Sequence, residues 1–295
     1  MTDACIRAVV ESIHSSPTQA VLYLSGGASL ALGLLMSVPG ASNTVLEAVV
    51  PYSRMSMIQL LAKIPAKYCS QQTADEMALL AYNRALKLSS PGSPVLGVGF
   101  TGSLATTRPK QGDHRFHLST RTSDRHWAST VTLSKGLRSR DQEEKVSSYF
   151  LLKAIANACK VSSTFDSELT ESDVVADECE RFFDEEKELE QLINGQICFK
   201  YGNCFAETDK SNGDRKIILP GSFNPLHDGH LKLLEAATSI YGDGYPCFEL
   251  SAINADKPPL SIPQIKERVM QFGKIGEANY FYKLSEVLMY MWWKF

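Results

Sequence analysis

The sequence lacks several features that would assign a protein to a functional class at once. Among its 295 residues, 30 are lysine or arginine and 33 are aspartate or glutamate, which leaves a net charge of −3. A charge this small creates no broad field that would attract nucleic acid or an anionic membrane. No stretch reaches the ~20 consecutive apolar residues that a membrane-spanning helix needs. We therefore expect neither nucleic acid nor a membrane as a partner.

Paired cysteines are also missing. The chain has 7 cysteines, an odd number with no C-x-x-C pair, which argues against a disulfide framework or a zinc knuckle. Reduced thiols in the cytosol or nucleus are the simplest interpretation. The opening MTDACIRAVVESIHSS has early acidic residues and no long apolar core, unlike a secretory signal. We predict a cytoplasmic protein, with the nucleus as the alternative.

The residues that are present indicate a globular α/β protein of about two domains, with 44% hydrophobic and 21% charged residues. Residues 1–162 alternate between helical and strand periodicity, which predicts a three-layer α/β domain. Helices are expected over residues 3–15, 30–38, 54–64, 73–88 and 141–160. Strands are expected over residues 20–24, 45–50, 95–100, 116–122 and 127–133.

Two groups of polar residues in this domain suggest binding sites but have simpler interpretations. Three histidines without a carboxylate or cysteine at ligand spacing are interpreted as strand-face or solvated side chains: His114, His117 and His126. Four arginines are interpreted as a solvated strand end rather than a phosphate site: Arg121, Arg125, Arg138 and Arg140.

Residues 163–215 are rich in aspartate and glutamate and are predicted to be a linker. Its part over 171–193 is expected to be a helix, and 196–205 a short hairpin with Gly202-Asn203 at its turn. Asp184-Glu185-Glu186 is interpreted as a solvated face, with metal binding as the weaker alternative.

The stretch with the most chemical content is KIILPGSFNPLHDGHLKLLEAA, which begins at Lys216. It predicts a short buried strand over 216–219, a tight turn over 220–225 and a helix that opens near His227. This arrangement points backbone N–H groups and a positive helix end at a phosphate. His227 and His230 then share one helix face, and Gly229 lets a ligand approach the backbone.

The turn residues add a floor of small side chains and further N–H donors to this predicted anion site. They are Gly221, Ser222, Phe223 and Asn224. Such a site suits a nucleotidyl transfer, in which negative charge develops on phosphoryl oxygens. The alternative without a ligand is a surface turn with two solvated histidines.

The runs Gly221-Ser222-Phe223-Asn224-Pro225 and His227-Asp228-Gly229-His230 resemble the G-[ST]-F-x-P…H-x-G-H signature of the nucleotidylyltransferase superfamily. The sequence is most similar to its nicotinamide/nicotinate mononucleotide adenylyltransferase branch. The resemblance implies a Rossmann-like sheet, ATP with Mg²⁺, and His227 and His230 as catalytic residues on the triphosphate. Cytidine and pantetheine substrates stay open, because the H-x-G-H motif is shared among branches.

A second strand is expected over 246–253, and its following loop lies at the strand end where ligands bind in open α/β sheets. Asn254 and Lys257 in that loop are candidate contacts to the second substrate, although a plain exposed lysine fits equally well. A helix over 262–272 follows, with Arg268 expected to be exposed.

Residues 4–160 resemble the C-terminal domain of the competence-damage-inducible protein family, whose active members deamidate nicotinamide mononucleotide. The resemblance is carried by Leu24-Ser25-Gly26-Gly27, Val38-Pro39-Gly40-Ala41-Ser42 and the 97–102 run GVGFTG. The family's glutamate, serine and lysine positions hold Leu22, Tyr23 and Met57, while Tyr52 matches. An amidase needs an activated nucleophile, and Ser25 has no evident activator, so the resemblance implies an inactive relative that binds a nucleotide, acts as a scaffold or forms homo-oligomers.

The transferase region is shorter than the resemblance implies. The family fold needs about five parallel strands and a later I-S-S-T-x-x-R motif, but the motif is absent and residues 216–295 leave room for two or three strands. The resemblance stops near Lys274. We expect an incomplete Rossmann-like domain over 216–275 and a divergent aromatic tail over 276–295 with a short helix.

Three functions follow. The first is adenylyl transfer from ATP to a pyridine mononucleotide in NAD biosynthesis, with low or no turnover by this chain alone. The second is a non-catalytic nucleotide-binding or scaffold role. The third is residual amidohydrolysis of nicotinamide mononucleotide in the first domain.

Overall fold

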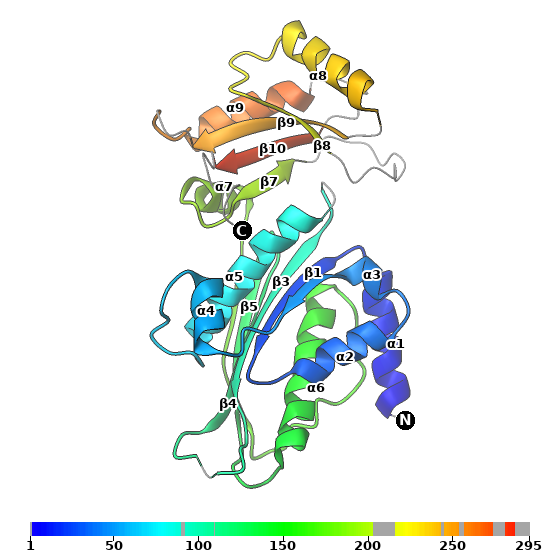
Figure 1. Cartoon of the computed structure of the whole chain (residues 1–295), viewed down its shortest axis with the longest axis vertical. Helices are drawn as coiled ribbons and strands as arrows, with labels where there is room; N and C mark the ends of the chain where they lie inside the picture. Colours follow the sequence, from blue (N-terminus) through cyan, green and yellow to red (C-terminus); the bar gives the residue numbers. More distant parts are fainter. Residues whose placement is uncertain are drawn as a thin grey trace. The chain divides into compact units, whose positions relative to one another are not determined.

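The structure, a computed structural model, describes residues 2–89, 92–108, 110–202, 216–242, 245–253, 257–273 and 281–286. The chain divides into two compact units: Met1–Ser89 with Ser93–Phe183, and Asp184–Phe295 with Ser90–Gly92. Each unit has its own sheet and helices, as the predicted α/β class requires (Figure 1).

The elements of the first unit follow the predicted segments within a few residues up to α6. Its helices are α1 (Thr2–Ser15), α2 (Ser29–Ser37), α3 (Ala41–Thr44), α4 (Arg54–Leu61), α5 (Gln71–Leu88) and α6 (Arg140–Ala158). Its strands are β1 (Gln19–Ser25), β2 (Val45–Val49), β3 (Val95–Ser103), β4 (His114–Arg121), β5 (Arg125–Leu133) and β6 (Val174–Phe182). Helix α3 and strand β6 have no counterpart among the predicted segments.

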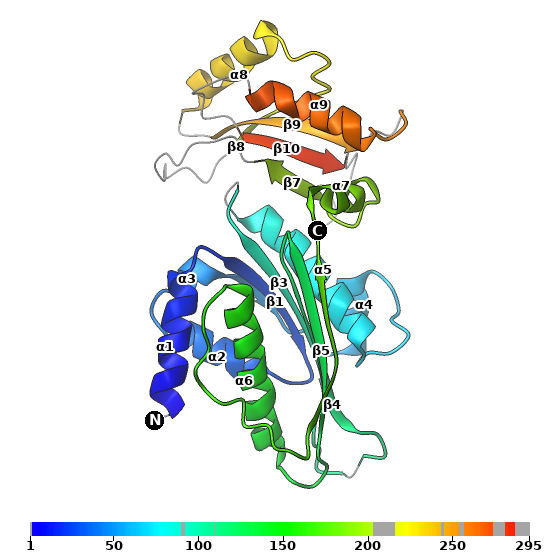
Figure 2. The same cartoon turned by 180° about the vertical axis from the view of Figure 1, so that it is seen from behind.

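The six strands form one mixed sheet in the order β2-β1-β3-β4-β5-β6. Strand β1 pairs in parallel with β2 and β3, and the remaining neighbours are antiparallel. Helices α4 and α5 cover one face, while α1, α2 and α6 cover the other (Figure 2). The three-layer prediction is confirmed, and the main apolar core lies between the sheet and the second helical layer.

Glycines in this unit serve backbone packing. A Cβ on Gly97 would lie 2.2 Å from the Ala78 carbonyl oxygen, and one on Gly99 2.1 Å from that of Ala74. Helix α5 therefore lies directly on β3. Gly26, at φ +80°, would place a Cβ 2.0 Å from the Gly102 carbonyl oxygen. Both glycine runs are explained by close backbone contact, without a ligand.

The helix predicted over 171–193 is wrong in its first part, because residues 174–182 form strand β6. This strand pairs antiparallel with β5, and the cross-strand contacts favour it: Arg125 forms an ion pair with Glu180, and Trp127 Nε1 donates to Glu178 at 2.9 Å. Glu180 balances the charge of Arg125 on β5, a long-range partner that local periodicity does not reveal. The first unit thus extends through Phe183.

The second unit contains helices α7 (Glu185–Ile193), α8 (Asp228–Tyr241) and α9 (Ile262–Gly273). Its strands are β7 (Phe199–Gly202), β8 (Lys216–Gly221), β9 (Tyr245–Ile253) and β10 (Phe281–Glu286), in the order β7-β10-β9-β8. Strands β8, β9 and β10 are parallel and β7 is antiparallel. The β8-α8-β9-α9-β10 succession is the Rossmann-like arrangement that the sequence predicts.

The predicted helix in the tail is wrong for residues 281–286, which form β10 between β9 and β7. An exposed edge of β9 offers a full row of backbone partners, and aromatic residues suit a strand. The predicted hairpin is replaced by pairing of β7 with β10. Its expected turn at Asn203, the loop 207–215 and the rest of the tail after 286 lie outside the described residues.

Across the part of the chain that the structure describes, none of the helices has the length and apolar character needed to cross a membrane.

A buried ion pair attaches the segment before β6 to the first unit. The Asp173 side chain is fully buried against Arg138 at 2.7 Å and accepts from the N–H groups of Ser134 and Thr170. Burial alone would raise the pKa of Asp173, but the guanidinium and these N–H donors outweigh it and hold that pKa well below its usual range.

We predict that Asp173→Asn lowers the free energy of unfolding by about 3 kcal/mol at pH 7, because it leaves a buried charge unpaired. The native protein should lose this contribution as the pH falls below about 4, since the unfolded carboxyl then binds protons more readily than the folded one. Urea denaturation at pH 7 and pH 3 measures both effects. Asp113→Asn, in an exposed pair with Arg115, is the control and should cost less than about 1 kcal/mol. Equal losses in the two variants would contradict this account.

Candidate functional site

The candidate site is the turn that joins β8 to α8. Strand β8 ends at Gly221, and α8 begins at Asp228 with His227 as its N-cap residue in an extended conformation. The predicted strand, turn and helix are therefore present, but the strand is not buried as predicted: β8 lies at the edge of the described sheet and Ile218 is 41% exposed. Phe223 has φ +44°, in the left-handed region, so the chain reverses sharply here. The turn brings the end of β8 beneath the first turn of α8.

The Phe223 side chain holds this turn from inside. It is only 1% exposed, and its ring lies 5.1 Å from that of His230, 5.3 Å from Phe248 and 5.2 Å from Phe272. A Cβ on Gly221 would lie 2.7 Å from this ring, so the glycine is required for the ring to fit. The Phe223 side chain is thus a buried packing residue, while the predicted phosphate contact of this turn residue stays a prediction.

Helix α9 holds the same turn from outside through two side chains. Gln271 bridges it, with Nε2 donating to the Phe223 carbonyl at 3.0 Å and Oε1 accepting from the Leu226 N–H at 2.7 Å. Arg268 donates to the Ser222 carbonyl at 3.1 Å. Arg268 was expected to be merely exposed, and Gln271 was not foreseen. Neither has a local sequence signal, because both act across 45 or more residues.

His227 and His230 lie together, as predicted. Their rings stack with centroids 3.8 Å apart, and the His227 N–H donates to His230 Nδ1 at 3.3 Å. Because Nδ1 accepts, a neutral His230 ring carries its proton on Nε2. Burial, and then the neighbouring His227, lower the pKa of His230. A neutral His230 ring thus presents its Nε2–H as a donor, and its lowered pKa favours this neutral form near neutral pH.

The start of α8 supplies the rest of an anion site. In the first turn of α8 the His230 N–H donates to the His227 carbonyl at 2.9 Å, which leaves the N–H groups of Asp228 and Gly229 for a ligand, and Gly229 itself is exposed. A Cβ on Gly229 would lie 3.1 Å from the His227 ring, so a larger residue would disturb the imidazole. Asp228 stands exposed at the same helix start and complements the helix dipole when no ligand is bound.

For the remaining predicted ligand contacts, the structure gives exposure but no contact with the two histidines. Ser222 and Asn224 are exposed on the turn, and Lys257 is exposed after β9. Asn254 lies outside the described residues. The structure thus brings Gly221, Phe223, His227, Gly229 and His230 into one site, while the second-substrate role of Asn254 and Lys257 stays a prediction.

The donor set fits an anion better than a protein-held metal ion. No group of three or more histidine, cysteine, aspartate or glutamate residues that could hold a metal occurs within the described ranges. Mg²⁺ commonly binds proteins through few carboxylates and substrate phosphates. A triphosphate that carries its own Mg²⁺ is therefore compatible with this turn, where the protein supplies N–H groups and imidazoles.

The first unit also has a glycine turn before a helix, but a carboxylate of the same chain already occupies that helix start. Helix α2 follows the Gly26-Gly27 turn, and its first N–H groups, from Ser29 and Leu30, donate to the Glu144 carboxylate at 2.5 and 3.3 Å. This internal anion occupies the helix start where a phosphate would otherwise bind.

The residues at the amidase positions of the first unit do not form a reactive group. Tyr23 is 5% exposed, and burial, then Glu47, raise its pKa to about 12. Met57 is buried, Tyr52 is 72% exposed, and Ser25 donates to the Pro51 carbonyl at 3.2 Å. The expected loss of the family's amidase machinery at these positions agrees with this geometry.

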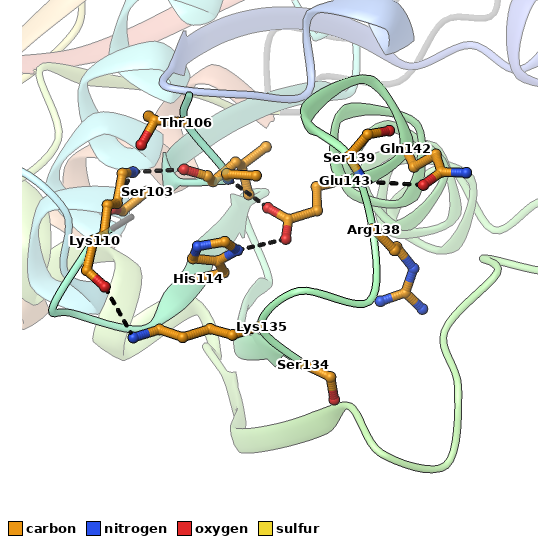
Figure 3. A network of polar contacts seen from close by, with 12 residues as sticks. Ser103, Thr106, Lys110, His114, Ser134, Lys135, Arg138, Ser139, Gln142 and Glu143 are labelled. Atoms are coloured by element: carbon orange, nitrogen blue, oxygen red, sulfur yellow. Dashed lines mark hydrogen bonds and ion pairs between the residues drawn. The ribbon is translucent and has the colours of Figure 1, made fainter. Parts of the chain in front are cut away.

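His114, His117 and His126 lie on strands, as predicted, but none of the three is exposed. His114 Nδ1 lies 2.6 Å from the fully buried Glu143 carboxylate (Figure 3). His117 contacts Thr130 at 2.8 Å, and His126 contacts Ser119 at 2.9 Å. Sequence spacing did not reveal Glu143 as a partner of His114.

The prediction that four arginines form a solvated strand end is wrong. Arg121 is 4% exposed and stacks on Phe183 at 3.8 Å. Arg125 pairs with Glu180, Arg138 with Asp173 and Arg140 with Glu144. The four arginines have separate structural partners and do not form one phosphate site.

We predict that the pKa of His230 in the free protein lies below the usual histidine value of about 6.5 and rises when Mg²⁺–ATP binds, because phosphate charge favours the imidazolium. Side-chain ¹H–¹⁵N NMR across a pH titration measures both values. The His227→Ala variant should move the free His230 pKa upward by removing the neighbouring imidazolium. A His230 pKa that changes neither when ATP binds nor when His227 is replaced would rule out the proposed coupling.

We predict that Gln271→Ala weakens Mg²⁺–ATP binding roughly tenfold, because about 1.4 kcal/mol of turn stabilisation is lost and the Leu226 N–H is left unpaired. Met270→Ala on the same helix is the control, since Met270 is 65% exposed. Calorimetric titration of both variants compares them. Equal affinities would show that Gln271 does not hold the site.

Comparison with known proteins matches residues 218–289 to the family described as Cytidylyltransferase-like. The match includes β10 and extends beyond Lys274, where the sequence resemblance was expected to stop. No curated protein matches the chain.

Among solved structures, the competence/damage inducible protein CihA from Agrobacterium tumefaciens is 18% identical, with a TM-score of 0.37, covering 53% of this chain and 92% of its own. A competence or damage-inducible protein from Enterobacter asburiae is 12% identical, with a TM-score of 0.39, covering 54% and 95%. A competence-damaged protein (CinA) superfamily protein from Escherichia coli is 12% identical, with a TM-score of 0.37, covering 54% and 87%. These likenesses carry no functional argument, whereas the family match shows that residues 218–289 are similar to the Cytidylyltransferase-like family.

Proposed function

We propose that the second unit binds ATP with Mg²⁺ at the β8–α8 turn and transfers its adenylyl group to a mononucleotide, with nicotinamide or nicotinate mononucleotide as the acceptor. The single observation that carries this proposal is the stacked His227 and His230 pair at the open start of α8. Paired imidazole N–H donors beside free helix N–H groups recognise phosphate. The cytidylyltransferase-like match of residues 218–289 supports the same reaction class.

In this reaction an oxygen of the acceptor phosphate attacks the α-phosphorus of ATP. The bond from that phosphorus to the bridging β-phosphate oxygen breaks, and pyrophosphate leaves with the negative charge. Bound Mg²⁺ would neutralise part of that charge. The N–H groups of Asp228 and Gly229 and the imidazoles of His227 and His230 would donate to the phosphoryl oxygens as their charge grows.

The acceptor would bind near the carboxyl ends of the parallel strands, where ligands lie in open α/β sheets. Lys257 follows β9 and is exposed, so its ammonium is available to an acceptor phosphate. We propose Asn254 as a second contact to the acceptor.

A second candidate is nucleotide binding without turnover. It is favoured by the position of β8, which lies at the edge of the described sheet, whereas a complete doubly wound sheet continues beyond this strand. In this case the turn would bind ATP without transferring its adenylyl group.

We predict that the native chain binds Mg²⁺–ATP in a calorimetric titration and that the His227→Ala, His230→Ala double variant binds it roughly a hundredfold or more weakly, because two donors to the phosphates are lost. His126→Ala in the first unit is the control and should bind as the native chain does. Absence of binding by the native protein, or equal binding by the double variant, would overturn the proposal.

A pyrophosphate-release assay with each candidate mononucleotide separates the two functions. Release that depends on the acceptor and on His227 and His230 identifies the transferase. Binding without release identifies the non-catalytic protein.

A further inference from the structure

Helix α8 carries an apolar flank that no step of the proposed function uses. Leu233 is 56% exposed, Ile240 is 76% exposed, and Ala236 is exposed between them. With 3.6 residues per turn, these three residues and the half-buried Ala237 share one side of the helix. An exposed apolar surface of this kind marks a site of interaction.

The apolar flank is distinct from the side of α8 that belongs to the core of its own unit. That side is defined by Leu234, which is 1% exposed where α8 packs on β8 and β9. The other flank is polar, with Glu235 and Ser239 exposed, and Lys232 is exposed on the outward side. The folding of the second unit therefore does not explain the apolar flank.

The position of α8 leaves room for a neighbour. Strand β8 is the last strand of the described sheet, and α8 packs on it, so this helix lies at the open end of the sheet (Figure 1). Tyr241, at the end of α8, is 71% exposed and extends the apolar surface. A partner can approach α8 along its whole length from this side.

The order of residues along the flank favours a second copy of this chain as the partner. Leu233, Ala236, Ala237 and Ile240 read large, small, small, large from either end. A two-fold axis that sets two α8 helices antiparallel places Leu233 beside Ile240 of the second copy, and the alanines of both copies at the crossing. Small side chains there let the helices approach to the 8–10 Å of ordinary helix packing, and a two-fold interface requires this kind of self-complementarity.

The charges of α8 are compatible with this pairing. The flank itself has no charged residue, and Lys232 lies at its outer rim. In the antiparallel arrangement Lys232 faces Ser239 of the second copy, and Glu235 lies on the far side of the helix. No like charges are brought together, which would otherwise oppose self-association.

We propose that the chain forms a two-fold dimer in which the apolar flank of α8, made of Leu233, Ala236, Ala237 and Ile240, packs antiparallel against the same flank of a second copy. This surface differs from the one expected from the sequence, which was in residues 1–162. Gly229 lies about two helical turns from the crossing, so the anion site at the start of α8 stays outside the contact. The dimer is therefore independent of the proposed adenylyl transfer, and each proposal can fail alone.

The first test is analytical ultracentrifugation of the full chain over a concentration series up to about 100 µM. We expect a monomer–dimer equilibrium for the native chain. The Leu233→Arg, Ile240→Arg double variant should raise the dimer dissociation constant at least about a hundredfold, because two apolar contacts per copy are lost and like charges meet. Met270→Arg is the control, since Met270 is 65% exposed on α9, and should dimerise as the native chain does. Thermal unfolding verifies that each variant is folded.

The second test locates the contact by disulfide cross-linking. Under mild oxidation, Ala236→Cys at the crossing should give a covalent dimer well above the level that the native cysteines produce. Glu235→Cys, one residue away on the polar flank, is the matched control and should stay at that level. A monomeric native chain, a dimer that survives the double arginine variant, or equal cross-linking at positions 235 and 236 would each overturn the proposal.

Discussion

The geometry of the candidate nucleotide site depends on the burial of one side chain, Phe223. Its ring contacts His230, Phe248 on β9 and Phe272 on α9, so a strand, a helix and the site share one aromatic cluster. The burial requires a left-handed backbone at Phe223 and a glycine at 221. The residue that looks like a ligand contact in the motif is thus the one that shapes the turn from inside.

A second constraint is electrostatic. Two stacked imidazoles 3.8 Å apart do not readily carry two positive charges, and the lowered pKa of His230 reflects both burial and this repulsion. An arriving phosphate would reverse the balance and make protonation favourable. The turn of the first unit differs: Glu144 accepts from the first N–H groups of α2, whereas Gly229 in the first turn of α8 is exposed. The two glycine turns of this chain therefore have different roles.

The sequence was informative where the determinants are local. The strand, turn and helix around His227 follow from adjacent residues, and so do most elements of the first unit. Prediction from the sequence failed where pairing with a distant strand determines the secondary structure. Strand β6 is stabilised by Arg125 and Trp127 of β5, which bind its acidic residues. Strand β10 pairs with the edge of β9 that would otherwise be open. The contacts of Gln271 with the turn and of His114 with Glu143 could not be found by spacing, since tertiary folding alone brings those atoms together.

The measurement that tests the account most directly is a crystal structure of the chain with Mg²⁺ and a non-hydrolysable ATP analogue. The account predicts that the triphosphate lies at the start of α8, within hydrogen-bond distance of the Asp228 and Gly229 N–H groups and of His230 Nε2. An analogue bound at another place on the chain, such as the Gly26-Gly27 turn, or one that leaves the start of α8 empty at saturating concentration, would contradict it.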